Sequence, residues 1–289
     1  MQLIIDSNSL AYKSFYSMRG LRTKEKETAV SFGFMKDILM LAKKYETNKF
    51  YFCWDSKKSY RKKIYKLYKA NRKPKDKEKE KELKSAYSQF DDLKNKILPR
   101  LGFKHVYEQD YYESDDLMAW LVDFNRIWIG DKLVVVTNDG DLYQVLEPGV
   151  KIYNHSSKKE TTMRSFKREY GILPSKWAEV KAIGGCSTDN VKGIKGVGEK
   201  TAISYLLGNL KKGKKFDDIK NGEKIINRNR KLVTLPFDGS KVKGGVYIGL
   251  LFAMEIFRKE DFIQTFDDYS FASFLKGKLW KDWQKVFSL

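Results

Sequence analysis

Cysteine and histidine are scarce in this 289-residue sequence, which contains two of each. Cys53 and Cys186 lie far apart and no CxxC or Cys/His cluster is present, so neither a zinc site nor a disulfide framework is implied. The notable hydrophobic run, VYIGLLFAM near 246 to 254, is far too short to span a bilayer. The N-terminal stretch MQLIIDSNS meets an aspartate at position 6 and is not a signal peptide. We therefore expect a soluble protein of a reducing cytoplasm, without membrane contact.

Acidic residues are in deficit, because 37 Asp and Glu stand against 57 Lys and Arg. The formal net charge is +20 and the pI is about 9.6. An excess this large indicates a polyanionic partner, most simply nucleic acid. A lysine-rich surface that only keeps the protein soluble is the alternative. Hydrophobic residues make up 42% of the chain, which is enough to bury a core.

The alternation of short β-rich runs with helical patterns predicts the fold class. A helical pattern, SFGFMKDILMLAKKY at 31 to 45, separates the first two runs. Strands that alternate with helices indicate βαβ units, so we expect an α/β fold with a mostly parallel central sheet and flanking helices. The expected strands are residues 3–6, 49–55, 132–139 and 150–154.

Three of these runs end in an aspartate, namely Asp6, Asp55 and Asp139, and Asp141 follows the last of them. One aspartate at a strand end is an ordinary turn residue. In open α/β sheets, however, ligands bind at the carboxyl ends of the strands. The repeated pattern therefore predicts an acidic site at one edge of the sheet.

The stretch YYESDDLMAWL at 111 to 121 adds three carboxylates, Glu113, Asp115 and Asp116, at the start of an amphipathic helix. At about 100° per residue, Glu113 projects in line with the apolar residue Leu117, toward the interior. The alternative is simple stabilisation of the helix N-terminus by acidic residues, with Ser114 as the N-cap. If this helix follows the strand FKHVYE, its carboxylates start at the same acidic rim.

Seven carboxylates at one edge need compensation, because their repulsion and desolvation are unfavourable. Oxygen ligands without His or Cys suit hard cations, namely Mg²⁺ or Mn²⁺. Two such ions about 4 Å apart can activate a water and stabilise the leaving oxygen of a phosphodiester. An acidic pocket for metals within a basic surface for a nucleic-acid backbone fits this composition.

Two further regions differ in composition from the α/β pattern. From Lys57 to Lys84 there are fourteen Lys or Arg and four Asp or Glu, and KDKEKEKE at 75 to 82 is expected to be solvated or mobile. After about residue 170 the strand signals fade. GILPSKWAEVKAIGG predicts a turn and a helix, and GIKGVGEKTAISYLL a glycine-rich hairpin that leads into a helix. We expect an α/β domain at 1–170 and a mainly helical second region at 171–289.

Five ordered motifs resemble the 5′ nucleases, which include flap endonucleases, bacteriophage 5′ exonucleases and the 5′ nuclease domain of bacterial DNA polymerase I. The resemblance spans roughly the first 210 residues and implies a PIN-like fold with a basic helical arch at about 56–98. The motifs are IIDSNSLAYKSFYSM (4–18), FCWDSKKSYRKKIYKLYKANR (52–72), YYESDDLMAWL (111–121), VVVTNDGDLYQVL (134–146) and GGCSTDNVKGIKGVGEKTA (184–202).

The resemblance implies residue roles that composition does not supply. It implies two metal ions, Mg²⁺ or Mn²⁺. It implies catalytic roles for Asp6, Asp55, Glu113 and Asp139, with Lys69 and Arg72 over the scissile phosphate. The implied metal ligands are Asp6, Asp55, Glu113, Asp115, Asp116, Asp139, Asp141 and Asp189. The implied DNA contacts are Arg61, Tyr65, Tyr68, Lys69, Arg72, Gly193, Lys195, Gly196, Gly198 and Lys200.

The spacing of Arg61, Tyr65, Lys69 and Arg72 is four, four and three residues, so on a helix they would share one face. Basic residues there can hold phosphate while a tyrosine stacks on a displaced base. A solvated basic helix face is the alternative.

GIKGVGEKTA resembles the helix-hairpin-helix element of the family, which often holds a K⁺ ion. Its glycines would let backbone N–H groups approach a phosphate beside a helix N-terminus, whatever the base sequence. The resemblance therefore implies that the helical region at 171–289 binds DNA.

One position departs from the family pattern, because GCSTDN stands where the family usually carries GD-x-x-DN. Cys186 therefore occupies the place of the first aspartate. It is a weak ligand, a small buried apolar residue or a sign of impaired metal binding.

The predicted function is divalent-metal-dependent hydrolysis of phosphodiesters at or near the 5′ end of branched or nicked DNA, including flaps and RNA primers in replication. The expected partner is duplex DNA with a 5′ single strand, the expected state a monomer, and the location the cytoplasm, or the host cytoplasm for a bacteriophage protein. One alternative is a branched-DNA-binding protein of the same fold with weakened catalysis, which Cys186 supports. Another is an RNA-processing nuclease.

Overall fold

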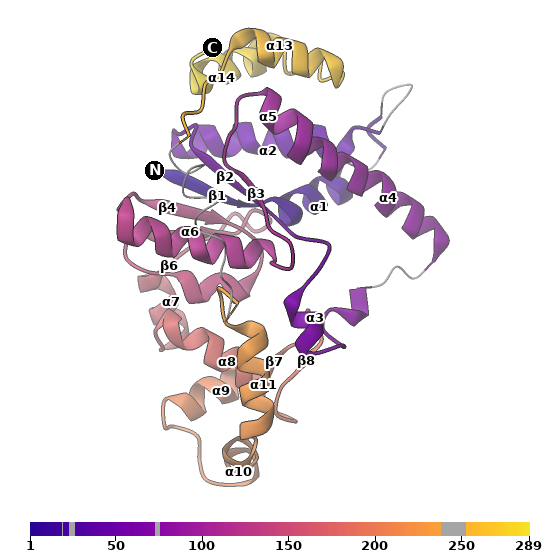
Figure 1. Cartoon of the computed structure of the whole chain (residues 1–289). Helices are drawn as coiled ribbons and strands as arrows, with labels where there is room; N and C mark the ends of the chain where they lie inside the picture. Colours follow the sequence, from indigo (N-terminus) through magenta and orange to yellow (C-terminus); the bar gives the residue numbers. More distant parts are fainter. Residues whose placement is uncertain (19, 23–26, 73–75, 238–252) are drawn as a thin grey trace. The chain divides into compact units, whose positions relative to one another are not determined.

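The computed structural model describes residues 1–18, 20–22, 27–72, 76–237 and 253–289 (Figure 1). The chain divides into two compact units, each assembled from segments that are separate in sequence. Unit 1 comprises Met1–Asp55, Pro74–Glu108 and Lys243–Leu289, and unit 2 comprises Ser56–Lys73 and Gln109–Val242. The arch predicted at 56–98 thus contributes to both units. The predicted boundary at residue 170 stays a prediction.

Unit 1 contains three parallel strands in the order β3-β2-β1. All residues of β1 and β2 are buried, as expected for parallel strands that are covered on both faces. The strands are β1 (Gln2–Asp6), β2 (Phe50–Trp54) and β3 (Val106–Glu108). The helices are α1 (Ser7–Ser17), α2 (Ala29–Tyr45), α4 (Lys77–Asp92), the π-helical turn η2 (Leu93–Ile97), α5 (Leu98–Arg100), α13 (Lys259–Asp268) and α14 (Gly277–Phe287).

The C-terminal helices α13 and α14 belong to unit 1, where α14 packs on α2 and α13 on α5 (Figure 1). Their contact is aromatic, because Phe262, Phe266 and Trp283 are fully buried and the ring of Trp283 lies 5.2 Å from that of Phe266. Aromatic pairs at such distances stabilise a core beyond the area they bury. These residues therefore extend the hydrophobic core of unit 1.

Unit 2 contains the parallel pair β4–β5 with β6 antiparallel at its edge, and a separate antiparallel pair β7–β8. Its strands are β4 (Leu133–Val136), β5 (Val150–Tyr153), β6 (Glu160–Thr162), β7 (Gly185–Cys186) and β8 (Val191–Lys192). Its helices are α3 (Tyr60–Ile64), η1 (Ala70–Arg72), α6 (Ser114–Trp128), η3 (Gly140–Val145), α7 (Met163–Tyr170), η4 (Pro174–Lys176), α8 (Trp177–Gly184), α9 (Glu199–Leu206), α10 (Lys214–Asn221) and α11 (Glu223–Val233).

The predicted mixed α/β class, with a largely parallel sheet and flanking helices, is confirmed. The four predicted strands are present, although β4 ends at Val136, so Asp139 lies in the loop beyond it. The N-cap of α6 is Glu113, and the alternative of Ser114 as the N-cap is wrong, because the helix begins at Ser114 itself, one residue earlier than that alternative requires. Residues 77–82 are exposed and helical, with Asp76 as the N-cap of α4.

Of the helices in the described part of the chain, none combines the length and apolar character that a bilayer crossing requires. Most of the predicted apolar run at 246 to 254 lies outside the described residues.

Candidate active site

Asp116, in the first turn of α6, is completely buried. Its carboxylate accepts two hydrogen bonds from the Arg61 guanidinium, at 2.6 and 2.7 Å. It also accepts the backbone N–H groups of Glu113 at 3.1 Å and Phe237 at 2.8 Å. Four donors on one carboxylate satisfy its burial without an external cation. In this arrangement Asp116 supports the start of α6, and its predicted role as a metal ligand stays a prediction.

Arg61 is likewise internal, with 2% of its surface exposed. Besides Asp116 it donates to the carbonyl of Leu232 at 2.7 Å, and its guanidinium lies 5.1 Å from the Phe237 ring centre. These contacts join α3, α6 and the end of α11 within unit 2. The structure therefore gives Arg61 internal partners, and its predicted contact with DNA stays a prediction.

Replacing Arg61 with Ala should lower the free energy of unfolding by about 3–5 kcal/mol, because it leaves a buried carboxylate without its counter-charge. Lys62→Ala, at an exposed neighbouring position, should change the same quantity by less than about 0.5 kcal/mol. Urea denaturation of both variants measures the difference. Equal small effects would show that the Arg61–Asp116 pair contributes little to stability.

Tyr68 and Lys69 converge on two carboxylates of unit 2, Glu113 and Asp189. The Tyr68 hydroxyl lies 2.9 Å from an oxygen of each. Lys69 Nζ lies 2.7 Å from Glu113 Oε2 and 3.9 Å from Asp189 Oδ1. Arg72, although exposed, reaches Asp189 Oδ1 at 2.7 Å. The structure thus brings three of the predicted basic-segment residues together with two predicted ligands.

The predicted single helical face for Arg61 to Arg72 is wrong. α3 ends at Ile64, and Lys69 adopts a left-handed backbone conformation with φ of +52°, which an α-helix does not contain. The N–H of Lys69 donates to the carbonyl of Asp189 at 2.9 Å, and Asn190 Nδ2 donates to the carbonyl of Leu67 at 2.8 Å. Hydrogen bonds to the neighbouring loop, rather than helix periodicity, therefore place Lys69.

Tyr65 faces another part of unit 2. The Arg228 guanidinium of α11 lies over its ring, 4.6 Å from the centre. Arg228 also donates to the carbonyl of Lys192 in β8 at 3.1 Å. One face of the Tyr65 ring is therefore covered by a cation, a contact that no sequence pattern predicts.

The cations set the charge of these carboxylates. Burial alone would raise the pKa of Glu113, but Lys69 and Arg61 outweigh it and lower this pKa to about 2. Asp189 behaves differently, because burial raises its pKa despite the opposing effects of Lys69 and Arg72. Glu113 is therefore ionised at neutral pH, whereas Asp189 is protonated more easily than an ordinary aspartate.

A second acidic group forms around the loop after β4. Asp139 Oδ1 accepts the N–H of Asp141 at 2.8 Å, and burial together with the charge of Asp141 raises the pKa of Asp139. The two oxygens of Asp141 are engaged by Lys181 Nζ at 2.9 Å and by Cys186 Sγ at 3.4 Å. Burial and then Asp141 raise the pKa of the Cys186 thiol to about 12, so it is a neutral donor. Sequence reasoning missed Lys181, because no motif contains it.

Among the residues that the structure describes, Asp141, Cys186 and Asp189 each bring one ligand atom to within 4.8 Å of the others. Asp189 connects this group to Glu113 through Tyr68. Four predicted metal ligands thus lie together in unit 2 with Cys186, the position that departs from the family pattern. The four are Glu113, Asp139, Asp141 and Asp189.

The other predicted ligands are Asp115, Asp6 and Asp55. Asp115 is in the first turn of α6 and is partly exposed. Asp6 and Asp55 belong to unit 1, at the carboxyl ends of the paired parallel strands β1 and β2. Asp6 caps the N-terminus of α1 by accepting the N–H of Ser9, and the N–H of Asp55 donates to the Asn8 side chain at 2.8 Å.

The predicted glycine-rich hairpin lies between α8 and α9. A Cβ at Gly193 would lie 2.2 Å from the backbone of Gly184, so this glycine permits two chain segments to pack. Gly196 has a φ of +72°, and open space surrounds Gly196 and Gly198. Gly198 is the N-cap of α9, which leaves the first turn of this helix accessible to an anion.

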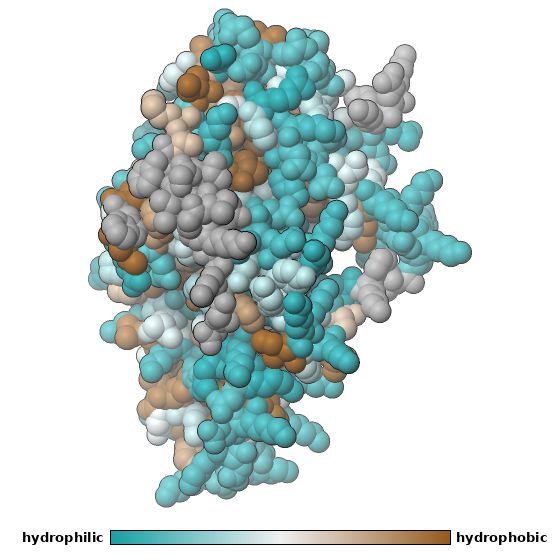
Figure 2. Space-filling model, in the orientation of Figure 1, coloured by the Kyte–Doolittle hydropathy of each residue, from teal (hydrophilic) through white to brown (hydrophobic). Residues whose placement is uncertain are grey.

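A basic surface continues from the hairpin. Between Val191 and Val233 there are twelve Lys or Arg and four Asp or Glu. α10 is fixed to α9 by the rings of Tyr205 and Phe216, whose centres are 5.4 Å apart. The surface over α10 is hydrophilic (Figure 2). Lys214, Lys215 and Lys220 are therefore carried by a packed helix.

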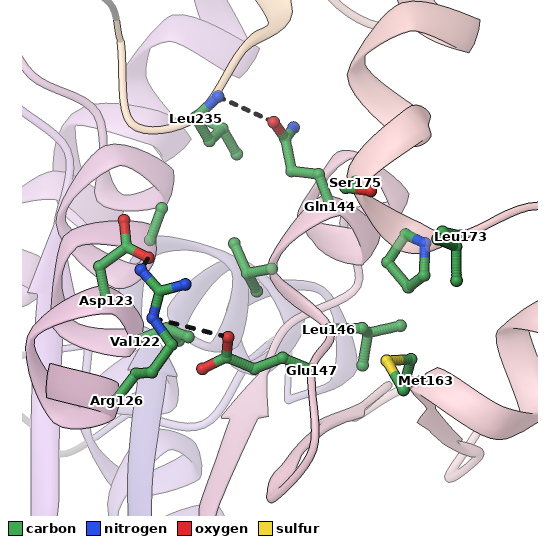
Figure 3. A pocket seen from close by; sticks show the side chains of 13 residues that line it. Val122, Asp123, Arg126, Gln144, Leu146, Glu147, Met163, Leu173, Ser175 and Leu235 are labelled. Atoms are coloured by element: carbon green, nitrogen blue, oxygen red, sulfur yellow. Dashed lines mark hydrogen bonds and ion pairs between the residues drawn. The ribbon is translucent and has the colours of Figure 1, made fainter. Parts of the chain in front are cut away.

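A mainly apolar pocket of about 280 Å³ lies between α6, the end of η3 and the start of η4 (Figure 3). At one side Arg126 faces Glu147 at 3.8 Å, and at the other the N–H of Leu235 donates to Gln144 at 2.8 Å. None of the 13 lining residues belongs to the predicted acidic set. The pocket is thus distinct from the candidate active site.

The fold and the acidic, cation-flanked site define a resolvase-like α/β nuclease. The chain belongs to the 5′-3′ exonuclease family, because the model of that family's N-terminal, resolvase-like domain matches residues 1–171. A 5′-3′ exonuclease of Buchnera aphidicola from Schizaphis graminum is 28% identical over 242 residues, covering 83% of this chain and 77% of the relative.

One further relative and one solved structure extend the comparison. DNA polymerase I of Thermus thermophilus is 31% identical over 206 residues, or 71% of this chain, which spans 23% of the length of the polymerase. The flap endonuclease of bacteriophage T5, solved in a pseudo-enzyme–product complex with DNA and metal ions, has a TM-score of 0.69 at 20% identity. The match covers 93% of this chain and 97% of that one, and establishes a shared fold.

Proposed function

We propose that this chain is a structure-specific 5′ nuclease, a flap endonuclease and 5′-3′ exonuclease that hydrolyses phosphodiesters of branched or nicked DNA and of RNA primers. The observation that carries the proposal is the convergence of Tyr68, Lys69 and Arg72 on Glu113 and Asp189. Adjacent cationic and anionic groups suit a phosphodiester and a divalent cation in one place. The T5 relative, solved with DNA and metal ions, supports both ligands.

The donor set fits a hard divalent cation. Glu113, Asp139, Asp141 and Asp189 supply oxygen atoms, which Mg²⁺ and Mn²⁺ prefer. The raised pKa of Asp139 reflects a burial that a bound cation would offset. Bound by these carboxylates, the ions would supply Lewis acidity toward water and the leaving oxygen. Asp6, Asp55, Asp115 and Asp116 complete the ligand set that we propose from the family resemblance.

The basic residues have separate tasks in this proposal. Lys69 and Arg72 neutralise charge that develops on the phosphate, because each places a cation beside the carboxylates. The hairpin binds the duplex backbone through N–H groups near Gly196 and Gly198 and through Lys195 and Lys200, without reading sequence. We propose a K⁺ ion at this hairpin, a monomeric state and a cytoplasmic location on the same resemblance.

Digestion of three labelled substrates tests this function: 5′-flap DNA, hairpin RNA and an RNA–DNA hybrid, each with Mg²⁺ and with EDTA. We expect Mg²⁺-dependent cleavage of the flap and of the RNA strand of a primer hybrid. Cleavage of hairpin RNA alone would identify an RNA-processing nuclease instead.

A branched-DNA-binding protein with weakened catalysis is the second candidate, and Cys186 is the observation that favours it. The thiol occupies a position among Asp141 and Asp189 where the family carries a carboxylate. Its pKa of about 12 means that it brings no negative charge to the cluster at neutral pH. Tight binding of flap DNA without cleavage in Mg²⁺ or Mn²⁺ would establish this candidate.

Cys186→Asp should lower the Mg²⁺ concentration for half-maximal cleavage by about ten-fold, a typical size for a change beside a metal site. The neutral thiol is a poor ligand for Mg²⁺, whereas Mn²⁺ is softer and should partly compensate in the native protein. Mg²⁺ titrations of cleavage rate and melting curves for both proteins measure the effect. An unchanged Mg²⁺ requirement with a lower melting temperature would instead show that Cys186 only packs against its neighbours.

A further inference from the structure

Lys181 connects the acidic cluster with the hairpin. Its Nζ lies 2.9 Å from Asp141 Oδ1 and 2.8 Å from Glu199 Oε1. Asp141 belongs to the candidate active site, whereas Glu199 is the first residue of α9, directly after Gly198 of the hairpin. One ammonium group therefore neutralises two carboxylates of unit 2. In the proposed function, Asp141 binds a divalent cation and the hairpin beside Glu199 binds a phosphate.

The two partners differ in their exposure to solvent. The side chains of Lys181 and Asp141 are 12% and 11% exposed, whereas that of Glu199 is 47% exposed. Charges that are partly withdrawn from water interact over several ångströms with little screening. A charged ligand that binds near Glu199 therefore shifts the Lys181 ammonium, and this shift changes the electrostatic potential at Asp141.

Contacts of α8 restrict the position of the Lys181 ammonium. Trp177, one turn earlier on α8, places its ring 5.3 Å from Lys181 Nζ. The indole N–H of Trp177 donates to the carbonyl of Gly140, between Asp139 and Asp141, at 2.7 Å. The same helix thus holds the acidic loop and the cation in one arrangement, in which the ammonium is shared between Asp141 and Glu199.

We propose that Lys181 couples divalent-cation binding at Asp141 to phosphate binding at the hairpin, an inference that rests on the proposed function. A cation beside Asp141 repels the ammonium toward Glu199. Neutralisation of Glu199 then removes a negative charge from the first turn of α9, where a phosphate would bind. A bound phosphate in turn attracts the ammonium and releases Asp141, so each ligand favours the other by the same factor.

Binding measurements on the full chain test this coupling without relying on cleavage. A blunt duplex is titrated in Ca²⁺, an oxygen-seeking cation that replaces Mg²⁺, and in EDTA. We expect the native protein to bind the duplex at least about 5-fold more tightly in Ca²⁺, and Lys181→Met and Glu199→Gln to reduce that ratio below about 2-fold. Lys181→Arg, which keeps the charge, should retain most of the ratio.

Calorimetric titration with Ca²⁺ in the absence of DNA supplies a second readout, with opposite signs for the two variants. Lys181→Met removes a positive charge beside Asp141 and should tighten Ca²⁺ binding. Glu199→Gln leaves the ammonium to Asp141 alone and should weaken Ca²⁺ binding. A purely structural role for Lys181 predicts weaker Ca²⁺ binding and a lower melting temperature in both variants, and that result would overturn the proposal.

Lys200→Met is the matched control, because it removes one positive charge next to Glu199 without a contact to Asp141. It should weaken duplex binding equally in Ca²⁺ and in EDTA, so that the ratio is unchanged. If the native protein cleaves flap DNA and binds duplex but Lys181→Met keeps the native ratio, only the coupling is wrong. If the native protein neither binds duplex nor cleaves flap DNA, the proposed function fails as well.

Discussion

Asp139→Asn should reduce the rate of flap cleavage by more than about 100-fold and leave flap binding largely intact. The loss of a proposed metal ligand should exceed the roughly 10–100-fold loss that is typical when a residue supporting a ligand is removed. Asp139 is half-buried, and burial with the charge of Asp141 already raises its pKa. The amide oxygen of asparagine can still accept the N–H of Asp141, as Asp139 does at 2.8 Å. The substitution therefore removes a negative charge and a proposed cation ligand while it preserves the hydrogen bond within the loop.

The matched control for this variant is Asp123→Asn, which removes a carboxylate on α6 that pairs with Arg126 at 3.0 Å. Single-turnover cleavage in Mg²⁺ and flap affinity in EDTA are measured for both variants. Asp123→Asn should behave like the native protein in both assays. A normal cleavage rate for Asp139→Asn would show that Asp139 is not part of a metal site.

Lys69→Ala should slow single-turnover cleavage by about 10²–10³-fold, the usual consequence of losing one group that stabilises transition-state charge. Its effect on affinity should be much smaller, because one phosphate contact contributes only a fraction of the total electrostatic attraction. Lys69 is held 2.7 Å from Glu113 by a backbone hydrogen bond to Asp189, so its position is specific. Removal of the side chain also leaves Glu113 without its nearest ammonium.

The comparison for Lys69 is the lysine group at the start of α4. Lys77→Ala and Lys79→Ala should produce only a modest change in salt dependence, because these exposed lysines alternate with acidic residues. Lys75, predicted to behave in the same way, lies outside the described residues. Rates and affinities at two salt concentrations measure the difference. Equal effects from Lys69 and the α4 lysines would mean that all of them act as a diffuse positive field.

The strands and their terminal aspartates were predictable because each signal is local. Buried parallel strands produce short apolar runs, such as Val134–Val136, and the carboxyl ends of such strands carry the ligand-binding residues. Asp6, Asp55 and Asp139 could therefore be chosen from the sequence alone. The bounds shifted by only a few residues, as at β4, where the strand ends before Asp139.

The arrangement of the basic segment was not predictable from its spacing. Helix periodicity assumes a continuous helix, whereas Lys69 is left-handed and bonded to the loop of Asp189. That bond joins residues more than a hundred positions apart, so no local pattern contains it. Arg61 illustrates the same limit, because its buried partner Asp116 and its carbonyl partner Leu232 come from distant segments.

Lys181 and Arg228 were missed for a related reason. Lys181 is the single cation of α8 and Arg228 is one of four cations in α11, so composition singles out neither. Their importance arises only from the carboxylates and the ring that they meet in unit 2. A weak signal existed at α8, where Trp177 and Lys181 are four residues apart and so share one helix face. Without the position of Asp141, this spacing predicts only a surface contact.

The polarity of cleavage tests the proposed 5′ nuclease activity most directly. A flap substrate with one dye at the 5′ end and a second dye at the 3′ end of the same strand is incubated with Mg²⁺, and the products are separated by length. We expect short fragments that carry the 5′ dye and a long duplex-bound fragment that keeps the 3′ dye, with no products in EDTA. Short fragments that carry the 3′ dye, or equal products in EDTA, would contradict a metal-dependent 5′ nuclease.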